Sequence, residues 1–172
     1  WQTYLNYGDR RLLDRYYPYM QKWLEYVAHY TVDGLLKKWP DTSYRNWYLG
    51  DWATPVGIDQ TNPLSVDLVD NCYIAVCYQT MSKIASLLGK ADDSRGYKAK
   101  YDALTKRIQE TFYDAKGNTY ASGTQIDLVY PMLAGVTLDN LKETVLKTLY
   151  EVTANRFQGH LATGLVGIPV LT

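Results

Sequence analysis

The chain has 172 residues, and its 18 Lys and Arg balance 18 Asp and Glu, so the formal net charge is zero. This balance argues against nucleic acids and anionic membrane surfaces as partners, because both attract proteins with a basic excess. No apolar run approaches the roughly 20 residues needed to span a bilayer. An apolar content of 47% favours a packed core over disorder. The 17 tyrosines and five tryptophans, beside only two phenylalanines, are typical of half-wet ligand surfaces.

The first long element covers residues 12–27, where apolar side chains recur at spacings of three and four. This spacing predicts a helix with one apolar face. Pro18 interrupts the stretch. Because proline has a fixed φ that suits the first helical turn, we expect Pro18 to open a second helix.

The pair Asn62-Pro63 is a strong helix-start signal, since an N-cap residue precedes a proline at the first helical position. Residues 64–88 are apolar on nearly all sides, which predicts a buried helix, and Gly89 should end it.

Three more helices are predicted in the second half of the chain. One follows a cap at Asp93, one covers residues 122–133, where Pro131 should kink or shorten it, and one covers residues 138–152. No convincing strand appears, so helices joined by short turns predict an all-α array of antiparallel helix pairs. The apolar positions of the first of these three helices are Tyr97, Tyr101, Leu104, Ile108 and Phe112.

Neither a metal nor a cofactor is predicted. His29 and His160 are the only histidines, and neither has a second ligand at metal-binding spacing. Cys72 and Cys77 are five positions apart, which places them ~140° apart around a helix, so we expect free thiols. The glycine-rich residues 159–164 lack the lysine and the preceding strand of a phosphate-binding loop, and no Gly-x-Ser-x-Gly string supports a nucleophilic triad.

Residues 31–62 break the helical pattern over a length at which loops are often functional. This stretch holds Trp47 and the string Tyr48-Leu49-Gly50-Asp51-Trp52. Indole faces suit the apolar face of a pyranose ring, and a neighbouring carboxylate accepts strong hydrogen bonds from sugar hydroxyls. Equally, these rings would pin the loop to the helices below it, and the composition leaves both interpretations open.

A pair of catalytic carboxyl groups is not found. All four glutamates fall in amphipathic helices among polar neighbours, where a solvated position is expected. Asp67 and Asp70 fit a helix-start role, and Asp127 would either face a cleft or serve in capping and solvation. Hydrolysis of a glycoside by acid and base needs two carboxyl groups flanking the bond, and none matches the loop context of Asp51. His160 would either bind a ligand or satisfy a helix end.

An ordered set of short strings resembles the bacterial α-L-rhamnosidases of glycoside hydrolase family 78, over essentially the whole chain. The resemblance implies that residues 1–172 are part of a six-hairpin glycosidase catalytic domain truncated at both ends. Such a part is a segment of an (α/α)6 toroid. Pro131 departs from the family pattern. The strings are Tyr7-Gly8-Asp9, Tyr17-Pro18-Tyr19-Met20, Trp23-Leu24-Glu25-Tyr26, Gly50-Asp51-Trp52-Ala53, Asn62-Pro63, Thr124-Gln125 and residues 159–167.

The family removes terminal α-L-rhamnose with inversion, so the resemblance implies a rhamnosylated carbohydrate as substrate. It places Asp51 and Trp52 in the sugar pocket, with Trp52 packed on the rhamnose ring; Trp47, Gln125 and His160 are expected to assist. The family's general acid and general base are glutamates outside this segment, so no catalytic residue is expected here. The partners are then the substrate and the remaining parts of the same polypeptide.

Two other interpretations stay open. The chain would be a helical carbohydrate-binding or scaffold module without chemistry, which the missing carboxylate pair favours. Alternatively, it would belong to a toroid glycosidase or lyase that acts on another sugar, because a fold does not by itself determine the reaction. The compartment is not determined by the sequence.

Overall fold

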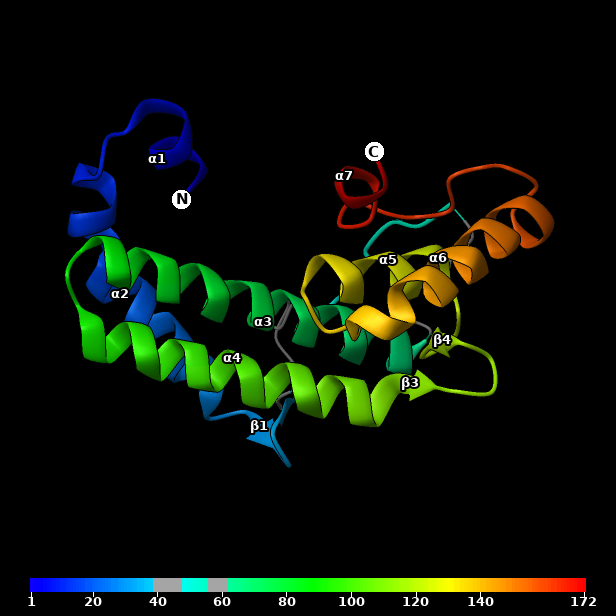
Figure 1. The fold of residues 1–172 in the computed structure, drawn as a ribbon, viewed down its shortest axis with the longest axis horizontal. Coiled ribbons are helices and arrows are strands. Elements are labelled where there is room, and N and C mark those ends of the chain that lie inside the picture. Colours follow the sequence, from blue (N-terminus) through cyan, green and yellow to red (C-terminus); the bar gives the residue numbers. More distant parts are fainter. Residues whose placement is uncertain (39–47, 56–61) are drawn as a thin grey trace.

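The computed structural model describes residues 1–38, 48–55 and 62–172. The described part is mostly helical, as predicted, and its long helices lie side by side (Figure 1). Trp47, one of the predicted site residues, lies outside the described residues. No described helix is both long enough and apolar enough to cross a membrane.

The chain begins with α1 (Gln2–Tyr7) and α2 (Arg11–Ala28). The prediction that Pro18 opens a second helix is wrong, because α2 runs through Pro18 without a break. A proline inside a helix leaves the carbonyl group one turn earlier without its amide donor. Pro18 lies on the exposed side of α2, where water can hydrate that carbonyl group.

The predicted apolar face of α2 is only partly buried. Tyr16 and Trp23 remain exposed, and they border an apolar groove of about 540 Å³ between α2 and α3 (Pro63–Leu87). The side chains that α2 buries lie largely one position further along the helix. They are Leu13, Tyr17, Leu24 and Val27.

The central helix α3 begins as predicted, with Pro63 in the first turn and the Asn62 side chain accepting a hydrogen bond from the Ser65 backbone at 3.3 Å. It is buried on most sides, and the chain turns at Gly89, which has a φ of +73°. The next helix, α4 (Ala91–Phe112), lies along α3 (Figure 1).

All five apolar positions predicted for α4 are buried, but the helix begins before the expected cap at Asp93. Asp93 instead accepts a hydrogen bond from the Tyr17 hydroxyl at 2.9 Å, which ties the start of α4 to α2. This contact joins residues 76 positions apart, so local sequence signals carry no information about it.

Two small antiparallel hairpins, which the sequence did not predict, interrupt the helices. One pairs β1 (Thr31–Val32) with β2 (Leu35–Leu36), and the other pairs β3 (Tyr113–Asp114) with β4 (Thr119–Tyr120). Buried Asn71 attaches the first hairpin to α3, because its side chain accepts from the Leu36 amide at 2.8 Å and donates to the Leu36 carbonyl at 3.0 Å.

The C-terminal third contains α5 (Gln125–Leu133), α6 (Lys142–Glu151) and α7 (Ile168–Leu171). Helix α5 is shorter than predicted and contains Pro131. The helix predicted over 138–152 is α6 between two irregular turns, a 3₁₀ turn η1 (Asp139–Leu141) and a π-helical turn η2 (Val152–Arg156).

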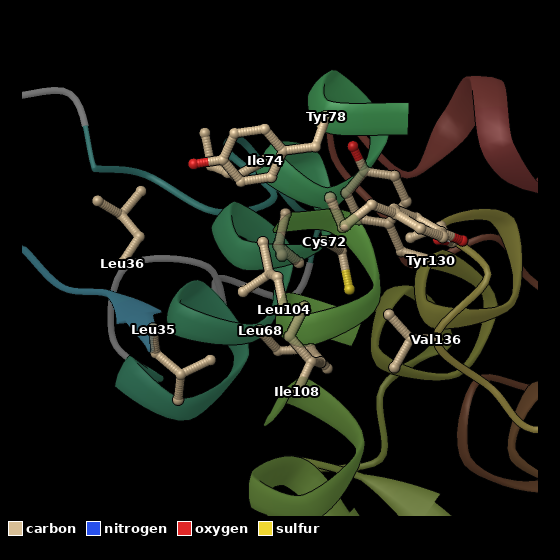
Figure 2. Close-up of a cluster of buried hydrophobic side chains, with 14 of the residues drawn as sticks. Leu35, Leu36, Leu68, Cys72, Ile74, Tyr78, Leu104, Ile108, Tyr130 and Val136 are labelled. Atoms are coloured by element: carbon tan, nitrogen blue, oxygen red, sulfur yellow. The ribbon is translucent and has the colours of Figure 1, made fainter. Parts of the chain in front are cut away.

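The core lies where α3, α4, α5 and β2 meet (Figure 2). Leu68 and Cys72 of α3 and Ile108 of α4 are fully buried there. Cys72 and Cys77 are both free thiols, as predicted. This core supports the start of α3 and Tyr48, close to part of the candidate site.

Candidate functional site

The two strings that the sequence singled out, Gly50-Asp51-Trp52 and residues 159–167, meet in the folded chain. We call residues 159–167 the glycine segment. The Asp51 carboxylate joins them, since Oδ2 accepts from the Gly164 amide at 2.8 Å. Its Oδ1 accepts from the amides of Val166 at 3.0 Å and Gly167 at 2.9 Å. Asp51 was predicted to bind the sugar. Its side chain is only 4% exposed, and both of its carboxylate oxygens accept hydrogen bonds from the main chain.

Trp52 has a different environment from its neighbour. Its backbone carbonyl accepts a hydrogen bond from the Leu165 amide at 2.9 Å, while its side chain is 42% exposed. The glycine segment therefore holds the Trp52 backbone in place and leaves much of the indole accessible. An accessible aromatic side chain on a fixed backbone suits contact with the apolar face of a ligand.

Glycine is required where the two strings touch. A Cβ atom at Gly164 would lie 2.0 Å from the Trp52 carbonyl oxygen, and one at Gly167 would lie 2.5 Å from the Thr163 Cβ. Gly50 has a φ of +61°, and a Cβ atom there would lie 2.8 Å from the Val66 Cα. These glycines allow close backbone approach rather than phosphate binding.

Gln125 holds the other half of the glycine segment. This side chain is fully buried; its Oε1 accepts from the Ala162 amide at 2.7 Å, and its Nε2 donates to the His160 carbonyl at 3.1 Å. The same Nε2 donates to the Thr153 hydroxyl in η2 at 2.9 Å. Gln125 thus binds main chain and a neighbouring hydroxyl, as Asp51 binds main chain.

His160 is exposed on the glycine segment, and its backbone amide donates to the Phe157 carbonyl at 2.8 Å. The structure therefore brings Asp51, Trp52, Gln125 and His160 together around one segment, with Trp47 outside the described residues. Asp51 and Gln125 are buried and hold the backbone, whereas Trp52 and His160 have exposed rings. The arrangement suits binding and positioning of a ligand.

The glutamates Glu25, Glu110, Glu143 and Glu151 are exposed on helices, as predicted. Asp127 caps α5 as predicted, but it is fully buried rather than solvated. Its carboxylate accepts from the Ser65 hydroxyl at 2.5 Å and so links the start of α5 to the start of α3. No group of three potential metal ligands occurs within the residues that the structure places.

Asp70 is a residue whose surroundings the sequence did not reveal. It lies beyond the first turn of α3 and lines a cavity of about 280 Å³, together with Tyr48, Gly50 and Val166. Burial raises the pKa of the Asp70 carboxyl to about 7, the charge of Asp67 adds to this, and a hydrogen bond from the Gly50 amide opposes it. The only signal in the sequence was an acidic residue two turns into a helix that is apolar on most sides.

Asp67, one turn earlier, is paired. Its carboxylate accepts from the Lys37 ammonium at 2.5 Å and from the Tyr48 hydroxyl at 2.7 Å. Together with burial, this contact raises the pKa of the Tyr48 hydroxyl well above its usual value. The two acids of α3 therefore differ, since Asp67 holds the loop and Asp70 faces a cavity.

Comparison with known proteins identifies relatives along the whole chain. Residues 1–172 match the model of the bacterial alpha-L-rhamnosidase 6 hairpin glycosidase domain. A protein named alpha-L-rhamnosidase from Formosa agariphila is 26% identical over 100% of this chain and 18% of its own length. A second, from an Alteromonas species, is 24% identical over 99% of this chain and 18% of its own. The chain thus spans under a fifth of these relatives.

Solved structures agree on the fold. An alpha-L-rhamnosidase from Dictyoglumus thermophilum superposes with a TM-score of 0.83 at 27% identity, over 96% of this chain and 18% of that one. An alpha-L-rhamnosidase from Aspergillus terreus superposes with a TM-score of 0.72 at 19% identity, over 95% of this chain and 18% of that one. At this identity the similarity shows the fold alone. The prediction of a segment of a six-hairpin toroid is confirmed.

Substituting Asp51→Asn should loosen the glycine segment. An amide has one acceptor oxygen and would turn its NH₂ group toward a backbone amide, and hydrogen bonds to a charged group are worth about 1.5–3 kcal/mol. We expect amide hydrogen exchange in residues 164–167 to speed up at least about tenfold, measured by mass spectrometry. The control is Asp102→Asn, at an exposed ion pair on α4. Unchanged protection in the Asp51 variant would contradict the anchoring role.

Substituting Gly164→Ala tests the close approach to Trp52. The added methyl group must displace the Trp52 carbonyl, so we expect a loss of about 1–3 kcal/mol in stability. The matched control is Gly96→Ala in α4, where a Cβ atom meets nothing within 4 Å and alanine should stabilise the helix by about 0.5–1 kcal/mol. Melting temperatures should move in opposite directions, and a rise for both variants would refute the steric constraint.

Proposed function

The chain belongs to the bacterial α-L-rhamnosidase six-hairpin glycosidase domain family, and from this premise we propose that its full-length protein hydrolyses glycosides with a terminal α-L-rhamnose. Relatives named alpha-L-rhamnosidase over the whole chain support the proposal. The observation that carries it is the half-exposed indole of Trp52 on a backbone fixed by the glycine segment.

We propose that cleavage proceeds with inversion. One carboxylic acid protonates the glycosidic oxygen while a second carboxylate activates water on the opposite face of the ring. The glutamates of this chain are exposed on helices, and the Asp51 oxygens are engaged by backbone amides. The acid and the base are therefore assigned to other parts of the same polypeptide, and this chain is taken to be one portion of the catalytic domain.

The chain's own contribution is to the sugar pocket. Trp52 would contact the apolar face of the rhamnose. The exposed ring of His160, and Trp47, which lies outside the described residues, are proposed as further contacts. Asp51 and Gln125 were expected to bind the sugar directly; their buried contacts favour a positioning role, in which they hold the backbone of Trp52 and His160. Loss of either would then misplace the contact residues.

The stereochemistry of the first product tests the proposed reaction. The full-length protein, mixed with an aryl α-L-rhamnoside in D₂O, should release β-L-rhamnose first, because a single displacement inverts the anomeric centre. Proton NMR within the first minutes distinguishes the anomers before mutarotation. Release of α-L-rhamnose would contradict inversion, and absence of any cleavage would contradict the proposed function.

Substituting Trp52→Ala in the full-length protein should lower kcat/KM for the same rhamnoside. Loss of one well-buried aromatic contact, worth about 1.5–3 kcal/mol, corresponds to a factor of about 10 to 150. Trp52→Phe should retain part of the activity because it keeps a ring. Tyr150→Ala, at an exposed aromatic residue of α6, is the control and should behave as wild type. An unchanged kcat/KM for Trp52→Ala would remove Trp52 from the pocket.

A further inference from the structure

A second binding feature lies next to the Trp52 string. The cavity of about 280 Å³ beside Asp70, which we call the Asp70 cavity, is lined in part by Trp23, Tyr48, Gly50, Tyr73 and Val166. Its volume lies just below the range of about 300–1,000 Å³ that is typical of small-molecule sites, and so suits one ring rather than a long ligand. Trp23 is 45% exposed and Tyr73 is 52% exposed, so both rings are open to contact.

The cavity contains an unsatisfied polar group. Oδ2 of Asp70 is buried and has no hydrogen-bond partner within the part of the chain that the structure describes. A buried polar atom without a partner is unfavourable, so its retention calls for a ligand or another explanation. The torsion about Cβ–Cγ of aspartate is soft, and a rotation would present this oxygen to a group in the cavity.

The charge of the cavity limits what it can hold. Among its described lining residues the ionisable ones are Asp70 and the tyrosines Tyr48 and Tyr73, and none is cationic. The neighbouring ionisable groups include Asp67, which is paired with Lys37 and whose charge adds to the rise of the Asp70 pKa, and Tyr130, whose pKa is raised mainly by burial and least by the charge of Asp70. The local charge is therefore negative or zero, which repels an anionic ligand and accepts a neutral hydroxylated one.

The position of the cavity relates it to the proposed sugar pocket. Gly50 and Val166 belong to the two strings that Asp51 joins, so the cavity borders that junction. Trp52 is not among its lining residues. A ligand in the cavity would thus lie beside the unit that Trp52 contacts.

We propose that the Asp70 cavity binds the sugar unit to which the terminal rhamnose is linked, with the Asp70 carboxyl hydrogen bonding to a hydroxyl group and Trp23 and Tyr73 contacting the ring. The unit is a neutral pyranose rather than a uronic acid. The proposal rests on the proposed function, because it takes the terminal sugar to lie at Trp52.

Three substrates of the full-length protein test it at pH 8, where the pKa of about 7 leaves Asp70 largely charged. They are an aryl α-L-rhamnoside, a rhamnosyl-glucose and a rhamnosyl-glucuronic acid. Asp70→Ala removes the hydrogen bond, so KM for rhamnosyl-glucose should rise about fivefold while kinetics on the aryl rhamnoside stay unchanged. Asp70→Asn keeps the hydrogen bond and removes the charge, so it should restore rhamnosyl-glucose cleavage and improve kcat/KM for the acidic disaccharide several-fold.

Asp102→Asn on α4 is the control and should match wild type on all three substrates. If Asp70→Ala lowers kcat/KM equally for the aryl rhamnoside and for rhamnosyl-glucose, the assignment of the cavity to the second sugar is overturned. Unchanged kinetics of both Asp70 variants would overturn it as well. If the wild type cleaves no rhamnoside, the proposed function fails separately. Calorimetric binding of methyl β-D-glucoside, abolished by Asp70→Ala, would then support the cavity as a pyranose site, and absence of binding to wild type would overturn it.

Discussion

The anchoring of the glycine segment by one buried carboxylate is the interaction on which the site depends. Asp51 accepts three backbone hydrogen bonds from residues more than 110 positions away, and such charge-assisted bonds are about twice as strong as neutral ones. A buried carboxylate is tolerated only when it is paired or well hydrogen bonded, so the segment and the carboxylate require each other. Gln125 completes this arrangement from α5.

This constraint explains why a residue that anchors the backbone lies next to a residue that is accessible to a ligand. Asp51 points into the junction and its neighbour Trp52 carries the half-exposed indole, while His160 is exposed on a segment whose carbonyl Gln125 holds. Such a division gives the contact residues a fixed backbone, which lowers the entropic cost of ordering them when a ligand binds. The chain thus resembles a preorganised wall of a pocket whose reacting groups are proposed to come from elsewhere in the polypeptide.

The acids of α3 show how the environment separates residues of one type. Asp67 is neutralised by Lys37 and hydrogen bonded by Tyr48, so it stabilises the connection between the first hairpin and the helix. Asp70, three residues later, faces a cavity, and one of its oxygens has no hydrogen-bond partner among the described residues. Helix periodicity places both near the same face but says nothing about which one meets a cation.

The sequence by itself determined the helices that depend on local signals. The Asn62-Pro63 start, the turn at Gly89 and the five buried positions of α4 follow from capping, backbone freedom and the 3.6-residue period, all of which act over a few residues. The ordered strings also pointed to the family and contained four of the five predicted site residues. Only the tertiary structure decided that Pro18 stays inside α2, that Asp51 and Gln125 bind main chain, and that Asp70 borders a cavity. Each of these depends on which side of an element meets solvent or a distant segment, and contacts between residues far apart in the chain leave no periodic trace in the sequence.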